Sequence, residues 1–402
     1  MPLQKIYLSL LLIFVGSLTH AQDPGFSQFY ANRVYLNPAY AGFDPGGTLI
    51  VNYRDQWFGL PDGDPTALTS SYRTINATFD LQLPCFFQSD HNSFGVAFSA
   101  LSDWAGSAPL VTNAASLALS YEQNIFGNPA RGGSSDSRLD LRVGFEAGMF
   151  QRQIKSDYFL YTESLHPLDG IVNGPEQYSF NTNLLPNMNA GVMVRGFAKI
   201  DNWRDIVYTM GLAFSNVNEP NISFTGADLD SLAMRTTIHG GFAFSTSSRT
   251  TTLRPPFIIG PQFRYDMQGG LRQLVLGSYF FSKAYYTGFF YQTVLNRLES
   301  APTSSNFFIG KNTNALIISA GVDLRTLADK DRWDRRDSGL VLGFSYDFSL
   351  GGLGNRNTLG TFELNLRYNL ISANRGRKRC DAAGGGKFEL FGNNTVKCPV
   401  SF

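Results

Sequence analysis

A strict two-residue alternation near the end of the chain is the feature that most limits how it can fold. From Phe362 to Leu370 every even-numbered position is apolar. Side chains two residues apart lie on the same side of a β-strand, so this segment has one apolar and one polar face. Similar alternation recurs along most of the chain and predicts an all-β protein. The odd-numbered positions are polar or charged, and they are Glu363, Asn365, Arg367 and Asn369.

The composition favours a barrel in lipid over a soluble protein. Charged residues make up 16% of the 402 residues and aromatic residues 14%. The charged share lies below the roughly 25% of ordinary globular domains. A membrane barrel needs few charges and many aromatic side chains at its two interfaces. The net charge of +1 gives no electrostatic reason to expect nucleic acid as a partner.

Residues 1–21 resemble a secretory signal peptide. Lys5 supplies the positive charge, Ile6–Val15 forms a short apolar core, and Thr19–Ala21 offers small residues for cleavage before Gln22. No later apolar run reaches the ~18 residues of a membrane-spanning helix. An exported chain of this kind is either secreted or an outer-membrane barrel.

We expect residues 48–370 to form one transmembrane antiparallel β-barrel of about fourteen strands. A soluble β-sandwich also alternates, but its polar face is outside and typically carries many Lys and Glu. The polar faces here are rich in Gly, Ser, Thr and Asn with isolated charges, which suits a confined, hydrated lumen. Residues 22–47 are then an N-terminal luminal hatch, and residues 371–402 a periplasmic C-terminal tail.

The connections are predicted to alternate in length, as is typical of outer-membrane barrels. Long polar connections are expected at residues 152–186, 216–233 and 295–313, and these are predicted to be extracellular. The short link Met267–Gly270 is predicted to be periplasmic.

The hatch prediction depends on the segment Asn37-Pro38-Ala39. Pro38 lacks a backbone donor and biases Asn37 toward an extended conformation. Residues 22–47 hold several aromatic side chains that favour burial, which supports a hatch folded into the lumen. The alternative is a simple surface turn.

Arg54 is predicted on the polar face of the first strand, with Tyr53 and Trp57 on its apolar face. A buried charge needs partners, so we expect Arg54 to anchor the hatch through backbone carbonyls or through carboxylates such as Glu122 or Glu146. The alternative is a contact with a ligand.

Cys380 and Cys398 lie on either side of a glycine run and a short alternating segment, which indicates a small hairpin. Export to an oxidising compartment permits a disulfide between them. The alternative is two free thiols.

No catalytic or cofactor site is expected. After the signal peptide the chain has only His91, His166 and His239, without metal-ligand spacing, and it has no G-x-S-x-G segment. The sequence therefore favours a protein that is not an enzyme, with no metal and no cofactor.

Four short motifs resemble those of the PorP/SprF family. Phe26-Ser27-Gln28 is followed by Leu36–Gly42, a Leu-Asn-Pro-Ala-x-Ala-Gly segment, and by Tyr53–Trp57, a Tyr-Arg-x-Gln-Trp strand. The ending Cys398–Phe402 is similar to the family's Cys-Pro finish with a terminal Phe. The motif residues carried over are Asn37, Pro38, Ala39, Gly42, Tyr53, Arg54, Gln56 and Trp57.

The resemblance implies an outer-membrane protein of Bacteroidota that works with the type IX secretion system, on a barrel of the fatty-acid-transporter type. Members support secretion and surface attachment of large adhesins, including those of gliding motility, through the adhesin's C-terminal domain. The implied partners are that domain, other type IX secretion components and outer-membrane lipid.

Two other functions stay open from the sequence. One is transport of a small hydrophobic solute, and the other is a structural connector between the secretion machinery and the periplasm. For adhesin binding we expect the aromatic-rich connection at 152–186 to be the contact, through Phe159, Tyr161 and Leu165. The alternative is that this loop folds inward over the lumen.

Overall fold

The fold was obtained as a computed structural model of the chain. Two predicted segments lie outside the described residues: the signal peptide at 1–21 and the C-terminal tail at 371–402. Signal-peptide cleavage, the disulfide between Cys380 and Cys398, and the bounds of these two segments therefore stay predictions. The structure describes residues 23–44, 47–60, 71–84, 92–106, 110–126, 137–155, 165–166, 170–171, 179–201, 204–224, 230–245, 257–282, 284–295, 314–324, 339–350 and 358–370.

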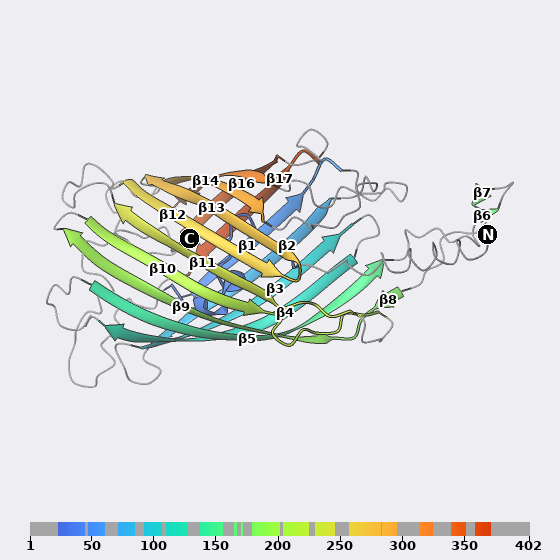
Figure 1. Cartoon of the computed structure of the whole chain (residues 1–402), viewed down its shortest axis with the longest axis horizontal. Helices are drawn as coiled ribbons and strands as arrows, with labels where there is room; N and C mark the ends of the chain where they lie inside the picture. Colours follow the sequence, from blue (N-terminus) through green and yellow to red (C-terminus); the bar gives the residue numbers. More distant parts are fainter. Residues whose placement is uncertain are drawn as a thin grey trace, which may run out of the picture.

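Fourteen antiparallel strands close into a barrel, which confirms the predicted fold class (Figure 1). The seam joins the first strand to the last, from Thr48 opposite Asn369 to Gln56 opposite Thr361. The barrel strands are β1 (Gly47–Gln56), β2 (Tyr72–Pro84), β3 (Ser93–Ala105), β4 (Leu110–Phe126), β5 (Ser137–Lys155), β9 (Leu185–Asp201), β10 (Arg204–Ser215), β11 (Arg235–Ser245), β12 (Phe257–Gln268), β13 (Leu271–Ser282), β14 (Tyr285–Val294), β15 (Ala315–Asp323), β16 (Gly339–Ser349) and β17 (Thr361–Asn369).

Three short strands lie in the connection between β5 and β9. β6 (Leu165–His166) pairs with β7 (Gly170–Ile171) in a separate two-stranded sheet. β8 (Ser179–Asn181) pairs with the end of β5 beyond the fourteen-strand ring.

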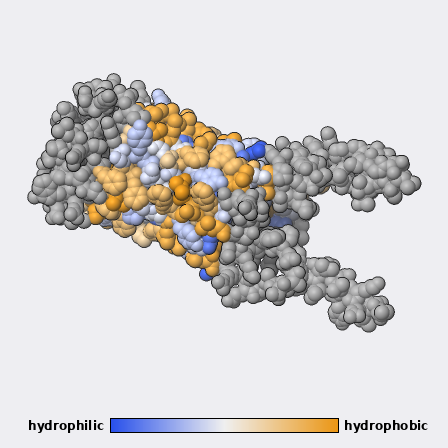
Figure 2. All heavy atoms as spheres, turned by 90° about the horizontal axis from the view of Figure 1, so that it is seen from above, coloured by the Kyte–Doolittle hydropathy of each residue, from blue (hydrophilic) through white to orange (hydrophobic). Residues whose placement is uncertain are grey.

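The alternation in β17 sorts its side chains as predicted. Glu363 is 2% exposed and faces the lumen, whereas its neighbour Leu364 is 49% exposed on the outer wall. Figure 2 shows apolar side chains covering much of the described outer wall on the side in view. An apolar outer face around a polar-lined lumen is the arrangement that a barrel needs in lipid.

The barrel has two mouths. We call the one where β1 begins and β17 ends the near mouth, and the opposite one the far mouth. Because strand direction alternates around the ring, the connections predicted at 152–186, 216–233 and 295–313 all belong to the far mouth.

The turn between β12 and β13 also belongs to the far mouth, so the prediction that Met267–Gly270 lies at the opposite end is wrong. The connections from β11 to β12 and from β15 to β16 are long, yet both belong to the near mouth. Connection length therefore does not separate the two ends of this barrel.

The N-terminal segment, residues 23–44, lies inside the ring of strands, where Figure 1 shows its blue trace behind the wall. It contains one short helix, α2 (Arg33–Leu36), and a 3-10 turn, η1 (Pro38–Tyr40). Asp23 bonds to Gln268 at the far mouth, and Asp44 pairs with Arg367 toward the near mouth. The segment therefore runs lengthwise through the lumen. No helix among the described residues is both long and apolar enough to cross a membrane.

Small wall residues make room for this segment. Five of them stand directly opposite one another on consecutive strands, from β10 across β9, β5 and β4 to β3. A Cβ added to the three glycines would overlap residues 37–42. This small-residue row comprises Ala213, Gly191, Gly144, Ser120 and Gly95.

The opposite wall meets the segment through aromatic side chains. The Tyr30 ring lies 4.2 Å from that of Tyr279 and stacks on Phe290 at 6.1 Å. Phe29 meets Phe290 edge-on at 5.9 Å. Aromatic pairs of this kind contribute about 0.5–1.5 kcal/mol beyond the area they bury, so the lumen interior is packed as a core.

The lipid-face assignment predicts that Leu366→Arg impairs folding. Leu366 is exposed near the middle of β17, and Arg at the bilayer midplane costs ~2–4 kcal/mol on the lipid face of a barrel. We expect a loss of the heat-modifiable folded form on gels. The matched control is Leu350→Arg, just beyond the end of β16 at the far mouth, which should fold normally. Equal folding of the two variants would contradict the face assignment.

Candidate functional site

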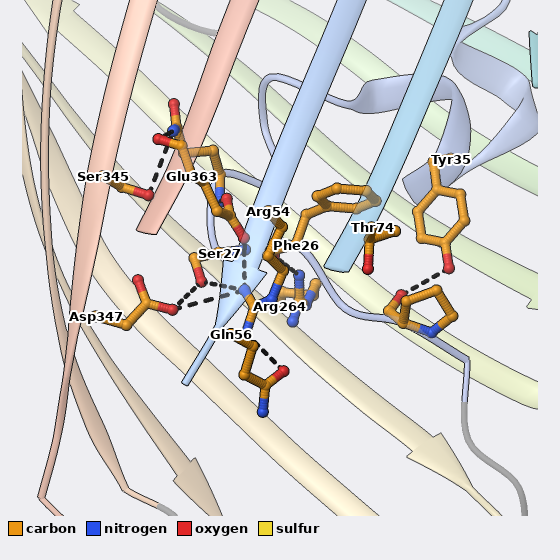
Figure 3. A network of polar contacts seen from close by, with 12 residues as sticks. Phe26, Ser27, Tyr35, Arg54, Gln56, Thr74, Arg264, Ser345, Asp347 and Glu363 are labelled. Carbon is orange, nitrogen blue, oxygen red and sulfur yellow. Dashed lines mark hydrogen bonds and ion pairs between the residues drawn. The ribbon is translucent and has the colours of Figure 1, made fainter. Parts of the chain in front are cut away.

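The seam between β1 and β17 holds the beginning of the N-terminal segment. The guanidinium of Arg54 on β1 donates to Glu363 on β17 at 2.5 Å and to the Ser27 hydroxyl at 2.7 Å (Figure 3). Glu363 also accepts the backbone N–H groups of Ser27 and Gln28 at 2.6 and 2.8 Å. Asp347 accepts from the Ser27 hydroxyl. Buried charges are stable only when paired in this way.

Arg54 thus contacts the segment, but the carboxylates proposed from the sequence are wrong. Glu122 pairs instead with Arg142, on strands away from the seam. Glu146 accepts a bond from Asn189 at 3.0 Å. Arg54 lies directly opposite Glu363 in the sheet register, which the linear sequence does not reveal.

Arg142 grips the middle of the segment. It is fully buried on β5, and its guanidinium donates to the carbonyls of Ala39 at 2.9 Å and Ala41 at 2.6 Å. The same group pairs with Glu122 at 2.5 Å and donates to the Ser120 hydroxyl at 3.0 Å. Arg142 therefore bonds two backbone carbonyls of the segment, and the Ser120 hydroxyl donates to the second of them, Ala41, at 2.5 Å.

Asn37 is the polar centre of the Asn-Pro-Ala motif. Its Nδ2 lies 3.0 Å from Nε2 of His239 and within 3.3–3.4 Å of the carbonyls of Val192 and Leu212. Its Oδ1 accepts the backbone N–H of Ala39 at 2.9 Å. The amide thus ties the segment to three wall strands and also begins the η1 turn.

The rest of the motif follows from close packing. Pro38 begins η1, where a missing N–H costs nothing. Ala39 is fully buried against Gly144 of the small-residue row. Gly42 has φ +62° and touches the backbone of Gly95, so neither its conformation nor its space admits a side chain.

A charged cluster closes the segment at its near-mouth end. Asp44 pairs with Arg33 of the segment and with Arg367 of β17. Burial alone would raise the pKa of the Asp44 carboxyl, but the two guanidiniums outweigh it and lower the pKa to about 2. The ring of Phe43 lies 5.0 Å from the Arg33 guanidinium, a cation–π distance.

The Tyr53–Trp57 motif lies at the far-mouth end of β1. The Tyr53 ring packs on Phe362 at 5.8 Å, and Trp57 meets Tyr72 edge-on at 5.4 Å. Gln56 accepts a hydrogen bond at 3.3 Å from the guanidinium of Arg54, also on β1. These residues support the seam strand, while the luminal face carries the contacts to the segment.

Reasoning from the sequence missed the wall side of these contacts. Arg142 and Glu363 are isolated charges at polar positions of alternating strands, and that signal was present in the sequence. The small-residue row had no such signal, because its members are adjacent only through strand register.

The far-mouth connections are partly described. The connection between β10 and β11 folds inward, where Ile222 and Leu232 pack against Phe150 of β5. Phe159 and Tyr161 lie outside the described residues, and Leu165 pairs through its backbone with Ile171. Their role as a binding surface stays a prediction.

The luminal wall contacts one continuous stretch of the chain, residues 23–44. These wall side chains can therefore hold the N-terminal segment in place. Two small cavities flank the segment, of about 50 and 20 Å³. Within the described part of the chain, no three His, Cys, Asp or Glu side chains group as a metal site.

This chain matches one protein family in sequence and resembles several solved outer-membrane barrels in fold. A search of curated proteins finds no match. A FadL homologue of Pseudomonas aeruginosa is 12% identical, covers 88% of this chain and 95% of its own, and has a TM-score of 0.39. A deletion mutant of the TodX monoaromatic hydrocarbon channel is 10% identical over 84% and 92%, with a TM-score of 0.39. The NalP translocator domain of Neisseria meningitidis is 11% identical over 81% and 87%, with a TM-score of 0.34.

The family model described as the type IX secretion system membrane protein PorP/SprF matches residues 18–368. That range contains the segment that fills the lumen and all fourteen barrel strands except the last residue of β17, Asn369. The chain therefore belongs to the PorP/SprF family and is an outer-membrane β-barrel of the type IX secretion system.

Proposed function

We propose that this barrel binds the C-terminal domain of a large secreted adhesin on its extracellular side and supports the adhesin's secretion and surface anchoring, gliding adhesins included. It acts as a non-enzymatic binding partner within the secretion system. Its other proposed partners are components of the type IX secretion system and outer-membrane lipid.

The observation that carries the proposal is the family match together with a lumen occupied by the chain's own segment. A barrel filled along its length offers its mouths and connections to a partner. The far mouth carries the connection from β5 to β9 and is the end turned away from both barrel termini. We assign this end to the cell exterior and to the adhesin.

Transport of a small hydrophobic solute is less well supported. Ligand pockets for such molecules typically span ~300–1,000 Å³. The two cavities beside the segment hold about 50 and 20 Å³. The structural connector would depend on the C-terminal tail, which lies outside the described residues.

The proposal predicts that Phe159→Ser, Tyr161→Ser and Leu165→Ser together release the adhesin into the medium. Aromatic and aliphatic anchors carry most of the energy of an interface, so their loss should weaken binding strongly. The cargo is first identified by isolating the surface-exposed protein and its partners for mass spectrometry. Its C-terminal domain is then tested for capture by the purified barrel.

The matched control replaces three other exposed apolar residues of far-mouth connections with Ser: Val217, Leu295 and Leu350. Both triple variants should assemble normally, and only the first should lose the adhesin. If the first retains wild-type adhesin while the control loses it, the binding surface lies in the other connections. If wild-type barrel captures no adhesin domain at all, the proposed function is wrong.

A further inference from the structure

A group of polar side chains interrupts the apolar outer wall at the far-mouth ends of β3, β4, β5 and β8. These side chains point outward, because they alternate in step with the exposed apolar residues Phe98, Leu117 and Met149. On β14 and β16 the outer wall near the same mouth is aromatic instead, with Tyr291 and Phe348 exposed. The polar patch, as we call this group, comprises Ser102, Asn113, Gln151, Gln153 and Asn181.

Strand register makes the polar patch continuous. Ser102 lies opposite Asn113, and Asn113 lies opposite Gln151. Closer to the rim, Gln153 lies opposite Asn181 of β8. Side chains directly opposite each other have Cβ atoms about 4.5–5.5 Å apart. The five residues therefore form one surface, and none of them is charged.

The two amides at the centre of the patch have open groups. The Oδ1 of Asn113 accepts a bond from the Ser102 hydroxyl at 2.6 Å, and within the described chain its Nδ2 is left as an open donor. The Nε2 of Gln151 donates to the carbonyl of Thr182 at 3.0 Å, and its Oε1 is left there as an open acceptor. Both side chains are exposed, so a molecule on the outer wall can reach them.

Trp104 adds an aromatic surface at the edge of the patch. It lies on the outward face of β3, two residues beyond Ser102 and diagonal to Asn113. On its other side it lies opposite Arg73, whose guanidinium is already paired with Asp55 at 3.4 Å. An anionic group placed here would lose hydration without meeting an unpaired guanidinium on β2, so the surroundings favour a neutral ligand.

The same strand faces continue into the lipid-facing wall. Leu117 lies four residues from Asn113 along β4, and Met149 lies two residues from Gln151 along β5; both apolar side chains are exposed. Because a strand advances about 3.3 Å per residue, Leu117 and Asn113 are about 13 Å apart along the wall. A lipid whose chains contact Leu117 would therefore place its head group beside the patch.

We infer that the polar patch binds the neutral sugar head group of an outer-leaflet glycolipid. Sugar hydroxyls both donate and accept hydrogen bonds, as the open Nδ2 of Asn113 and Oε1 of Gln151 require. The C–H face of a sugar ring also packs on an indole such as that of Trp104. A protein partner fits less well, because the cores of protein interfaces are enriched in aromatic residues, Met and Arg. The inference rests on the proposed function only for the assignment of the far mouth to the cell exterior.

The experiment equilibrates the whole detergent-solubilised protein with an equal mixture of three lipids. They are lipopolysaccharide with its core oligosaccharide, lipid A, which ends at its phosphorylated sugars, and phosphatidylglycerol. After washing, mass spectrometry counts the lipids that each barrel retains. We expect about tenfold more core-bearing lipopolysaccharide than either of the others, because only its core sugars offer hydroxyls without phosphate to the two open amide groups.

Asn113→Leu combined with Gln151→Leu removes both open groups and keeps side chains of similar size. This double variant should lose the tenfold preference for core-bearing lipopolysaccharide. Trp104→Leu leaves every amide in place and should weaken the same preference. The matched control, Gln123→Leu, changes an amide on the outward face of β4 toward the near mouth and should behave as wild type. Leucine suits the outer face of a barrel, so all variants should keep the heat-modifiable folded form.

Equal retention of the three lipids by wild type, or an unchanged preference in the double variant, would overturn the site. Loss of adhesin-domain capture by the double variant, with its lipid preference unchanged, would make the patch a protein contact instead. Wild-type barrel that prefers core-bearing lipopolysaccharide but captures no adhesin domain would keep the site and remove adhesin binding. Capture of the adhesin domain without any lipid preference would remove the site and leave the proposed function standing.

Discussion

Deleting residues 23–42 should turn a sealed barrel into an ion-conducting pore. The deletion removes the buried aromatic side chains and the backbone that fill the lumen, and it leaves polar wall side chains such as Arg142 and Glu363 facing water. The fourteen-strand ladder, including the seam, contains no residue of the deleted stretch. The measurement is single-channel conductance in planar bilayers, where the intact protein should show none.

The matched control refolds the deletion variant together with a synthetic peptide of residues 23–44, which should restore the closed state. A peptide with Asn37→Ala and Gly42→Val should restore it poorly, because it loses the amide contacts and clashes with the wall beside Gly95. If the deletion variant is as silent as the intact protein, the segment is not what seals the lumen.

Arg142→Met should destabilise the protein by ~3–5 kcal/mol, as is typical when one partner of a buried ion pair is removed. Methionine has a similar volume but cannot donate to the carbonyls of Ala39 and Ala41, and it removes the 2.5 Å ion pair with Glu122, whose carboxylate keeps the more distant Arg138 at 3.7 Å. The measurement is the free energy of unfolding in urea.

The control is Arg73→Met, which breaks the ion pair with Asp55 at 3.4 Å on a side chain that is 43% exposed. Only Asp55 of this pair is buried, and the Arg73 guanidinium stays open to water, so this variant should lose less stability than Arg142→Met. Adding Glu122→Gln to Arg142→Met should recover part of the loss, because the buried charge is then removed. Equal costs for the two arginine variants would show that Arg142 is not a structural anchor.

The strands could be predicted from the sequence because alternation is a local property. In β17 the period of two already assigns Glu363 to the lumen and Leu366 to lipid, and the structure agrees. The position of Asn37 in a turn could also be predicted, because proline restricts the residue before it. Each of these inferences needs only a few consecutive residues.

The partners of Arg54 could not be predicted in the same way. Arg54 meets Glu363 only because β1 and β17 pair in one register, and alternation says nothing about which residue lies opposite. The β12–β13 turn failed for a different reason. Its short length suggested the periplasmic mouth. Because strand direction alternates, the number of strands that precede a turn decides its mouth, and that number could be counted from the sequence.

The lengthwise course of the segment also dictates an order of assembly. Asp23 lies at the far mouth and Asp44 toward the near mouth, so the chain enters β1 only after traversing the whole lumen. A filled lumen leaves no width for threading afterwards, and the ring therefore closes around a segment that is already inside. The two seam strands, β1 and β17, contribute Arg54 and Glu363, which hold Ser27 between them. The N-terminal segment thus acts as a template for pairing β1 with β17. A chain without this segment should close its barrel more slowly.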